Sequence, residues 1–313
     1  MAQKEKSVAE VIKEHEASGK YFDVDGIKTF ALKYGRGEPV LCLHGVPTSS
    51  FLYRKVLRSL EKKGYKGVSI DMPGLGLTDR PDNFDYSFSN LADFLYKAAN
   101  ALKLKKFHLV VHDVGGPIGF ALAVRHANRI MSLTVLNTWV DVVNFKKPVV
   151  MRPFEKRVLG EAELKMISHV TWPVMFKQMG VVNSSRISTS EINAYVDLLK
   201  REDNGKAFLK IMRNFDHSKE FRDLCYKAVQ TKEYPVQAIW GAKDPALQLE
   251  TYGEEIKKVA GLKEVHTLRS RHFLQEEAWL GIADKVIDLA QSAQLKTAKR
   301  LSEKAAFFLY KKL

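Results

Sequence analysis

The sequence predicts a doubly wound, mostly parallel α/β sheet that carries an inserted helical cap. Short apolar runs that end in Gly, Pro or Asp alternate with helical patterns as far as residue 140. This alternation is typical of a parallel sheet covered by helices. Helical patterns alone fill the next ninety or so residues before the alternation resumes. We therefore assign residues 20–140 and 234–290 to a core, 141–233 to a cap and 291–313 to a terminal helix.

The elements of the core follow from their local patterns. Val8 to His15 is expected to be helical, and "YFDVDGIKTFALKYG" reads as a hairpin about an Asp-Gly turn. The uninterrupted apolar run "PVLCLHG" is typical of a strand buried on both faces. Further strands are predicted in "YKGVSI", "KFHLVVHD", "SLTVLN", "YPVQAIWG" and "EVHTL". The predicted helices between them are "SSFLYRKVLRSLEKKG", "SFSNLADFLYKAANALKL" and "PIGFALAVRHANRI".

Length and composition restrict the class of protein. The chain has 313 residues, of which 45% are hydrophobic and 27% charged, a profile typical of globular proteins. No apolar run approaches the ~18 residues that a membrane span needs, and the N-terminal residues lack the apolar region of a signal peptide. Cys42 and Cys225 cannot make a disulfide framework, and Cys42 lies in an apolar run. We expect a cytoplasmic, reducing location.

The net charge of +14 suggests an anionic partner, but it is partly local. No zinc-finger spacing, RRM signature or aromatic-rich basic tract is present, so no nucleic acid, metal or cofactor is predicted. Residues 291–313 carry six Lys and Arg against one Glu, with Leu295, Ala298, Leu301, Ala305 and Phe308 on one helical face. This face could dock on the core, or it could lie on anionic lipid as a peripheral membrane contact. Nothing in the sequence indicates an oligomeric state.

Three chemically active side chains follow predicted strands. Asp113 occupies the strand-to-helix turn "VHDVG", Asp244 lies in "WGAKDPA", and His272 lies in "RSRHFLQEE". The chain order of nucleophile, acid and histidine at strand ends is that of a hydrolytic triad. The alternatives are a structural aspartate at Asp113 and a turn-forming aspartate at Asp244. His44 and His112 are expected to orient loops by hydrogen bonding rather than to act as bases.

The motifs resemble the α/β-hydrolase superfamily, and within it the haloalkane dehalogenase and epoxide hydrolase branch, whose nucleophile is an aspartate. The motifs that carry this resemblance are "HGVPTSSFLYR", "DMPGLGLTDRPD", "VVHDVGG", "WGAKDP" and "RHFLQEE". The resemblance covers residues 20–290. It implies that Asp113 attacks a saturated carbon and that His272, held by Asp244, activates the water that hydrolyses the ester. The backbone N–H groups of Val46 and Val114 would form the oxyanion hole.

This sequence departs from the branch where the leaving group is stabilised. Valine stands at 114 and 46, where dehalogenases place Trp and Asn as halide donors. Trp172 and Trp139 could supply N–H groups, although packing in the core is the simpler interpretation. Epoxide hydrolases use two cap tyrosines, whereas the matching position here is Met212, and Tyr195 is the best remaining candidate.

The predicted pocket is apolar, so we expect a small hydrophobic substrate rather than a sugar or phosphate. Its expected walls are Val46, Val114, Trp139, Trp172, Met175, Phe176, Tyr195 and Met212. Ring strain helps an epoxide to open, which favours an epoxide over a haloalkane. A lactone or ester needs only the remaining groups, and a ligand-binding protein without turnover is a further alternative.

Overall fold

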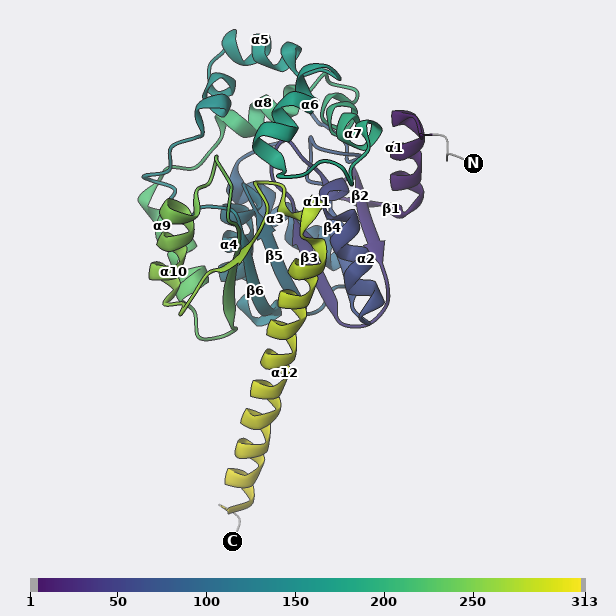
Figure 1. The fold of residues 1–313 in the computed structure, drawn as a ribbon. Coiled ribbons are helices and arrows are strands. Elements are labelled where there is room, and N and C mark those ends of the chain that lie inside the picture. Colours follow the sequence, from purple (N-terminus) through teal and green to yellow (C-terminus); the bar gives the residue numbers. More distant parts are fainter. Residues whose placement is uncertain (1–4, 311–313) are drawn as a thin grey trace.

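An eight-stranded sheet forms the centre of the protein (Figure 1). This computed structural model describes the backbone of residues 5–310 and the side chains of residues 5–295. The strand order is β1-β2-β4-β3-β5-β6-β7-β8. β1 and β2 form an antiparallel hairpin, β2 is also antiparallel to β4, and all other neighbours are parallel. The strands are β1 (Gly19–Val24), β2 (Ile27–Tyr34), β3 (Pro39–Leu43), β4 (Lys66–Ile70), β5 (Phe107–His112), β6 (Ile130–Leu136), β7 (Val236–Gly241) and β8 (His266–Leu268).

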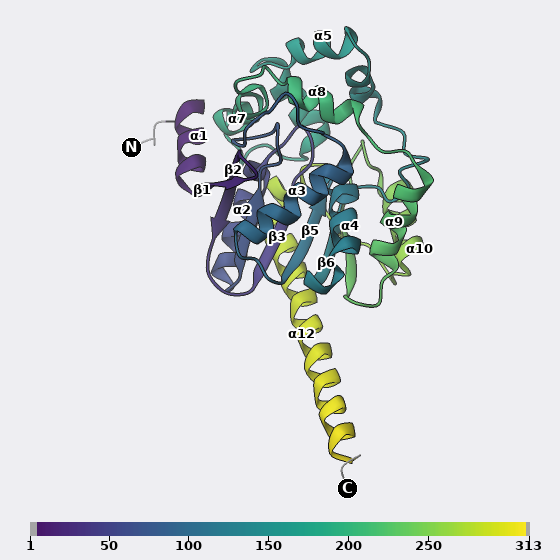
Figure 2. The ribbon, with the colours of Figure 1, turned by 180° about the vertical axis from the view of Figure 1, so that it is seen from behind.

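Helices cover both faces of this sheet, which confirms the predicted doubly wound α/β architecture (Figures 1 and 2). α2 and α12 pack together on one face, whereas α3, α4, α9 and α10 form a contiguous row on the other. The middle strand β5 is buried along its whole length, because helices exclude water from both of its faces. The helices outside the cap are α1 (Val8–Ala17), α2 (Arg54–Lys62), α3 (Phe88–Ala101), α4 (Gly115–Arg125), α9 (Lys219–Gln230), α10 (Glu254–Ala260), α11 (Leu274–Glu277) and α12 (Trp279–Tyr310).

The cap lies above the carboxyl ends of the strands, between β6 and β7 (Figure 1). Its helices are α5 (Leu159–Met166), α6 (Thr171–Met175), α7 (Thr189–Lys200) and α8 (Lys206–Arg213). α7 begins with a capping box, in which Ser188 and Glu191 each accept a hydrogen bond from the other's backbone N–H. No strand occurs between residues 137 and 235, all of which the structure describes.

Helix α9 packs with the core, whereas the sequence-based boundaries place it in the cap. The sequence assigns it to the cap because no strand separates it from the cap helices. In the structure it packs against α4 and α10 and so extends the helical layer of the core. Phe221, Cys225, Ala228 and Val229 form its buried face. The buried face of α9 therefore packs on the core. Of the predicted cap, residues 141 to about 217 lie over the strand ends.

Residues 291–310 continue the helix that begins at Trp279 and form no separate element. α12 runs from the core away from the cap in both views (Figures 1 and 2). Leu295, the first residue of the predicted apolar face, is 73% exposed. The rest of that face lies outside the described side chains. Among the described residues, no helix is long and apolar enough to cross a membrane.

Candidate active site

Asp113 occupies a sharp turn between β5 and α4. Its backbone has φ +53°, a left-handed conformation that is uncommon outside glycine, and this conformation lifts the side chain above the strand ends. The end of β6 holds the turn, because the Thr138 hydroxyl donates to the Asp113 carbonyl at 2.6 Å. The carboxylate fits only because residue 45 is glycine: a Cβ there would lie 2.3 Å from the Asp113 Cβ.

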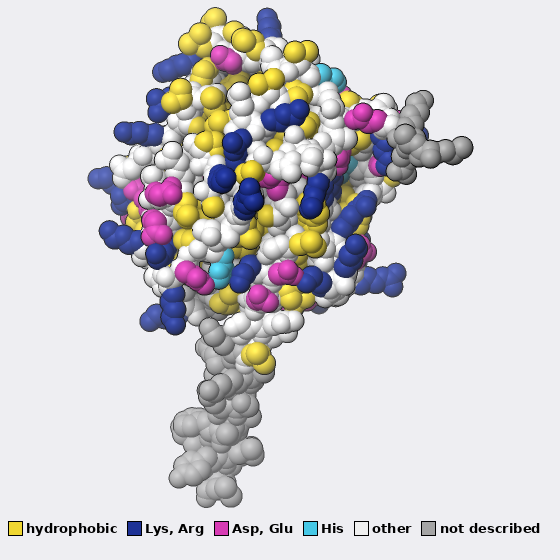
Figure 3. Space-filling view, viewed as in Figure 1, with side chains coloured by type: hydrophobic (Ala, Val, Ile, Leu, Met, Phe, Trp, Pro, Cys, Tyr) yellow, Lys and Arg dark blue, Asp and Glu magenta, His cyan; other side chains and the backbone are white. Residues whose placement is uncertain are grey.

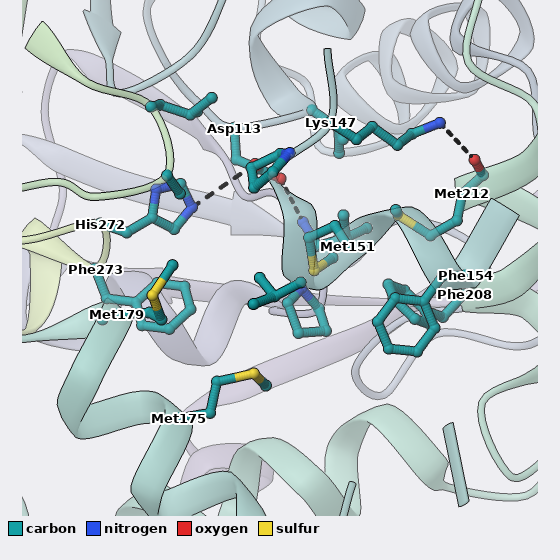
Figure 4. Close-up of a pocket in the computed structure, with 18 of the residues that line it drawn as sticks. Asp113, Lys147, Met151, Phe154, Met175, Met179, Phe208, Met212, His272 and Phe273 are labelled. Atoms are coloured by element: carbon teal, nitrogen blue, oxygen red, sulfur yellow. Dashed lines mark hydrogen bonds and ion pairs between the residues drawn. The ribbon is translucent and has the colours of Figure 1, made fainter. Parts of the chain in front are cut away.

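The two carboxylate oxygens of Asp113 have different environments (Figure 4). Oδ1 accepts a hydrogen bond of 2.9 Å from the Val46 N–H, and the Val114 N–H also donates to the carboxylate. Oδ2 lies 3.7 Å from Nε2 of His272, which is beyond normal hydrogen-bond distance. One oxygen thus rests in the predicted oxyanion hole, while the other faces the histidine.

His272 is oriented by Asp244. The imidazole Nδ1 lies 2.8 Å from Asp244 Oδ2, which leaves Nε2 directed towards Asp113. The Asn137 side-chain amide donates to the same Asp244 oxygen at 2.5 Å, and its carbonyl accepts from the Gly241 N–H. The backbone N–H groups of Ala246 and Leu247 donate to Asp244 Oδ1. These four hydrogen bonds hold the Asp244 carboxylate in place. Asp113, Asp244 and His272 lie together, as the sequence predicts.

Two further histidines support the site by hydrogen bonding, as expected. The His112 Nε2 lies 2.9 Å from the His272 carbonyl oxygen, which fixes the backbone of the catalytic loop. His44 accepts from the Met72 N–H with Nε2 and contacts the Gly45 carbonyl with Nδ1. These contacts require a neutral ring with the proton on Nδ1. Burial lowers the pKa of both histidines, which favours the neutral form.

The pKa values of Asp113 and His272 are both raised, for different reasons. Burial raises the pKa of Asp113 despite the opposing effects of His272 and the two backbone N–H groups. For His272, burial alone would lower the pKa, but the carboxylates of Asp244 and Asp113 outweigh it and raise the pKa above its ordinary value. The two carboxylates thus favour the protonated imidazole, and that imidazole opposes the rise that burial causes in the pKa of Asp113.

A mostly apolar cavity with an empty volume of about 820 Å³ opens over Asp113 and His272 (Figure 4). Seven of the eight predicted wall residues line it: Val46, Val114, Trp139, Trp172, Met175, Phe176 and Met212. Four methionines lie in its walls, namely Met151, Met175, Met179 and Met212. The indole N–H of Trp172 is buried and has no hydrogen-bond partner among the described residues. The mostly apolar lining suits a hydrophobic small molecule.

Tyr195 is a correction, because it does not line this cavity. Its ring packs among Phe51, Trp172, Phe176 and Phe273. Its hydroxyl donates to Glu276 at 2.5 Å. The tyrosine cannot reach the cavity because its hydroxyl satisfies a buried carboxylate beneath the cap.

Glu276 is the centre of a buried network that the sequence does not reveal. The carboxylate is fully buried and contacts the Arg54 guanidinium, the Lys55 ammonium at 2.8 Å and the Tyr195 hydroxyl. Arg54 also pairs with Glu191 of the cap at 2.7 Å. Although burial would raise the pKa of Glu276, Arg54 and Lys55 hold it below the usual value. The network joins α7 of the cap to α2 and to the segment that follows His272.

Lys147 is a second residue that sequence reasoning missed. It lines the cavity and is buried, and its ammonium donates to Glu155 at 2.6 Å and to the Met212 carbonyl at 2.9 Å. The ammonium also lies 3.7 Å from the centre of the Phe215 ring. Figure 4 shows its tip directed away from Asp113. Lys147 therefore ties residues 145–155 to α8 and contributes its aliphatic stem to the wall.

The described residues contain no cluster of three or more His, Cys, Asp or Glu side chains that could hold a metal ion. The groups that the site brings together are the Asp113 carboxylate, the Val46 N–H that donates to it and the His272 imidazole that Asp244 orients.

Comparison with known proteins agrees with the fold. The family described as alpha/beta hydrolase fold matches residues 38–278. The chain is 40% identical over 128 residues to a cis-3-alkyl-4-alkyloxetan-2-one decarboxylase of Shewanella oneidensis, a match that spans 40% of each protein. It is 25% identical over 264 residues to haloalkane dehalogenase 1 of Mycobacterium tuberculosis, covering 81% of this chain and 84% of the relative. The crystal structure of epoxide hydrolase VrEH1 from Vigna radiata has a TM-score of 0.71 at 21% identity, over 88% of this chain and 97% of the other.

Proposed function

Because the chain belongs to the α/β-hydrolase fold family and resembles its haloalkane dehalogenase and epoxide hydrolase members, we propose that it hydrolyses a hydrophobic epoxide through a covalent ester of Asp113. The observation that supports this most directly is the placement of the Asp113 oxygens. Oδ1 accepts from the Val46 N–H, whereas Oδ2 is free of the hole and lies near His272. A general base would gain nothing from donors on its own carboxylate, but an ester-forming nucleophile would.

In the first step, Oδ2 of Asp113 attacks a ring carbon and the carbon–oxygen bond breaks, with its electron pair moving to the ring oxygen. The unpartnered N–H of Trp172 can donate a hydrogen bond to that oxygen, which then takes a proton from solvent and becomes a hydroxyl. Oδ1 becomes the carbonyl oxygen of the new ester and keeps its backbone donors. Relief of ring strain drives the step.

In the second step, His272 takes a proton from water, and the resulting hydroxide attacks the ester carbonyl carbon. Negative charge develops on Oδ1, which already accepts a hydrogen bond from the Val46 N–H. Collapse of this intermediate breaks the ester bond, and the departing alkoxide takes the proton held by His272 to complete the diol. The Asp113 carboxyl then loses the proton of the added hydroxide to solvent, which restores the carboxylate. Asp244 stabilises the imidazolium in between.

A strained β-lactone is a second candidate, supported by two observations. The 40% identical relative is named for oxetan-2-one decarboxylation, and no tyrosine lines the described cavity. Attack of Asp113 on the ring carbon that bears the alkyl oxygen would release a carboxylate, which needs no proton donor. Loss of CO₂ from that product would then form an alkene and expel Asp113 without using water.

Labelled water tests the proposed covalent route. During multiple turnovers in ¹⁸O-water, label should enter the Asp113 carboxylate, because water attacks its carbonyl carbon. Peptide mass spectrometry of the segment containing Asp113 measures this, with Asp244 as the internal control that should stay unlabelled. Labelled product with an unlabelled Asp113 would contradict the ester and indicate direct attack by water. Absence of any product would favour a binding protein.

Mild acid should arrest the wild-type protein between the two steps. The ester removes the negative charge of Asp113, so the pKa of His272 should be lower in the intermediate than in the free enzyme. Below that pKa the imidazole is protonated and cannot accept a proton from water, whereas Asp113 still attacks until it is itself protonated. Samples that react with substrate at about pH 5.5 and are then quenched should therefore show more adduct by intact-mass spectrometry than samples that react at about pH 8. The adduct should disappear when the pH is raised again; equal amounts at both pH values would exclude His272 as the base.

A further inference from the structure

Large aliphatic side chains gather on the outer surface of the cap. Nine large hydrophobic side chains are exposed in the described part of the chain, and seven of them fall between residues 149 and 174. In Figure 3, hydrophobic side chains cover the top of the molecule, where Figure 1 places α5. This apolar cap surface comprises Val149, Val158, Leu159, Met166, Val170 and Val174, together with Val150. Such a concentration typically marks an interaction surface.

Val158 indicates that the apolar cap surface does not stabilise the fold. It is 79% exposed, and its backbone has φ +69°. A β-branched residue is strained in this left-handed conformation, and its exposed methyl groups add nothing to the core. A polar residue or glycine would suit the position better. An apolar contact outside the molecule would give this side chain a use.

The charge around the apolar cap surface is positive. Six exposed basic residues surround it: Lys146, Arg152, Lys156, Arg157, Lys165 and Lys177. None of the six forms an ion pair in the part of the chain that the structure describes. Two of the three acidic residues in the same segment are neutralised, Glu155 by Lys147 and Glu161 by Arg213. The surface is thus complementary to an anionic partner.

The apolar cap surface is continuous with the cavity over Asp113. Val150 lines the cavity and is 45% exposed, so it belongs to both. Met151 and Met175, on either side of it, line the cavity and are half-buried. An apolar molecule resting against the cap could therefore reach Asp113 along apolar side chains without entering water.

We propose that the apolar cap surface docks on an anionic lipid bilayer. Its aliphatic side chains would enter the acyl boundary, and the surrounding Lys and Arg would contact anionic headgroups. Delivery of apolar substrates from the bilayer rests on the proposed function, but docking itself does not.

This surface is distinct from the basic C-terminal residues. α12 runs away from the cap (Figures 1 and 2), so a bilayer that contacts α5 would not contact the end of α12. The two sites can therefore be separated by substitution. Leu295 and Leu280 of α12 are exposed and give matched controls outside the cap.

Vesicle co-sedimentation of the full chain tests the proposal. The unmodified protein should sediment with vesicles that contain phosphatidylserine, and less with pure phosphatidylcholine or at high salt. A double variant, Val158→Asp with Val170→Asp, should need about tenfold more lipid for half-maximal binding. Asp tolerates the left-handed conformation of residue 158 better than Val does, so the fold should be retained.

The control variants Leu280→Asp and Leu295→Asp should bind as the unmodified protein does. Loss of binding in Leu295→Asp, with the cap variant unaffected, would overturn the proposal and assign the contact to the terminal helix. Failure of the unmodified protein to bind any vesicle would also overturn it. Because sedimentation requires no turnover, these outcomes do not depend on the ester chemistry.

Discussion

Replacing His272 with glutamine should stop turnover after the covalent step and leave an alkyl adduct on Asp113. The histidine activates water, but Asp113 needs no base because a carboxylate is already ionised near pH 7. Glutamine keeps the approximate size of the ring but cannot accept the proton. We expect multiple-turnover hydrolysis to fall by about 10³-fold, the usual contribution of a positioned base. Intact-mass spectrometry after exposure to apolar epoxides should show protein plus one substrate mass.

Two comparisons make this result specific. Asp113→Asn in the same background should give no adduct, because the amide is not a nucleophile. A β-lactone provides the second comparison: an Asp113 ester that loses CO₂ needs no water, so the His272→Gln variant should still convert it. Full activity of this variant on an epoxide would contradict the base assigned to His272.

Replacing Glu276 with alanine should lower the free energy of unfolding by about 3–5 kcal/mol, the usual cost of breaking a buried charge cluster by removing one partner. The substitution leaves Arg54 and Lys55 beside each other and the Tyr195 hydroxyl without its acceptor. Urea titration followed by circular dichroism measures the loss. The loss should be complete above the ordinary glutamate pKa of about 4.3 and should shrink only in stronger acid, because the pKa of Glu276 is lowered in the folded state and its carboxylate stays ionised until the pH falls through that lowered value.

An exposed pair provides the control for this variant. Glu161 pairs with Arg213 at the surface, where water and salt screen the charges, so Glu161→Ala should leave the free energy of unfolding nearly unchanged. A loss at Glu276 no larger than this would show that the network contributes little to stability. Because Glu191 connects Arg54 to the cap, we also expect protease cleavage within the cap to increase in Glu276→Ala.

The sequence predicts the triad because its members follow predicted strands. Asp113 follows β5 directly and Asp244 lies just past β7, and the carboxyl ends of parallel strands necessarily share one edge of a sheet. His272 is found for the same reason after β8. A short local pattern is enough to place such residues, since the sheet itself brings them together.

Residues placed by tertiary packing could not be found in this way. Tyr195 lies on a helix whose rotation decides whether its hydroxyl meets the cavity or Glu276, and the periodicity of α7 does not distinguish these. Lys147 lies in an irregular segment with no period to interpret. Glu276 has the sequence context of an exposed acidic residue in a first helical turn, and its burial depends on α2 and α7 closing over it.

The methionines of the cavity wall make the site sensitive to oxidants. Met151, Met175 and Met179 are half-buried, so peroxide could reach their thioethers from the cavity mouth. A sulfoxide would place a polar, hydrogen-bonding group in a wall that otherwise offers apolar contacts. Apolar ligands would then be held more weakly although Asp113, Asp244 and His272 remain chemically intact. Methionine sulfoxide reductases reverse this oxidation, so the damage to the pocket would be repairable without new protein synthesis.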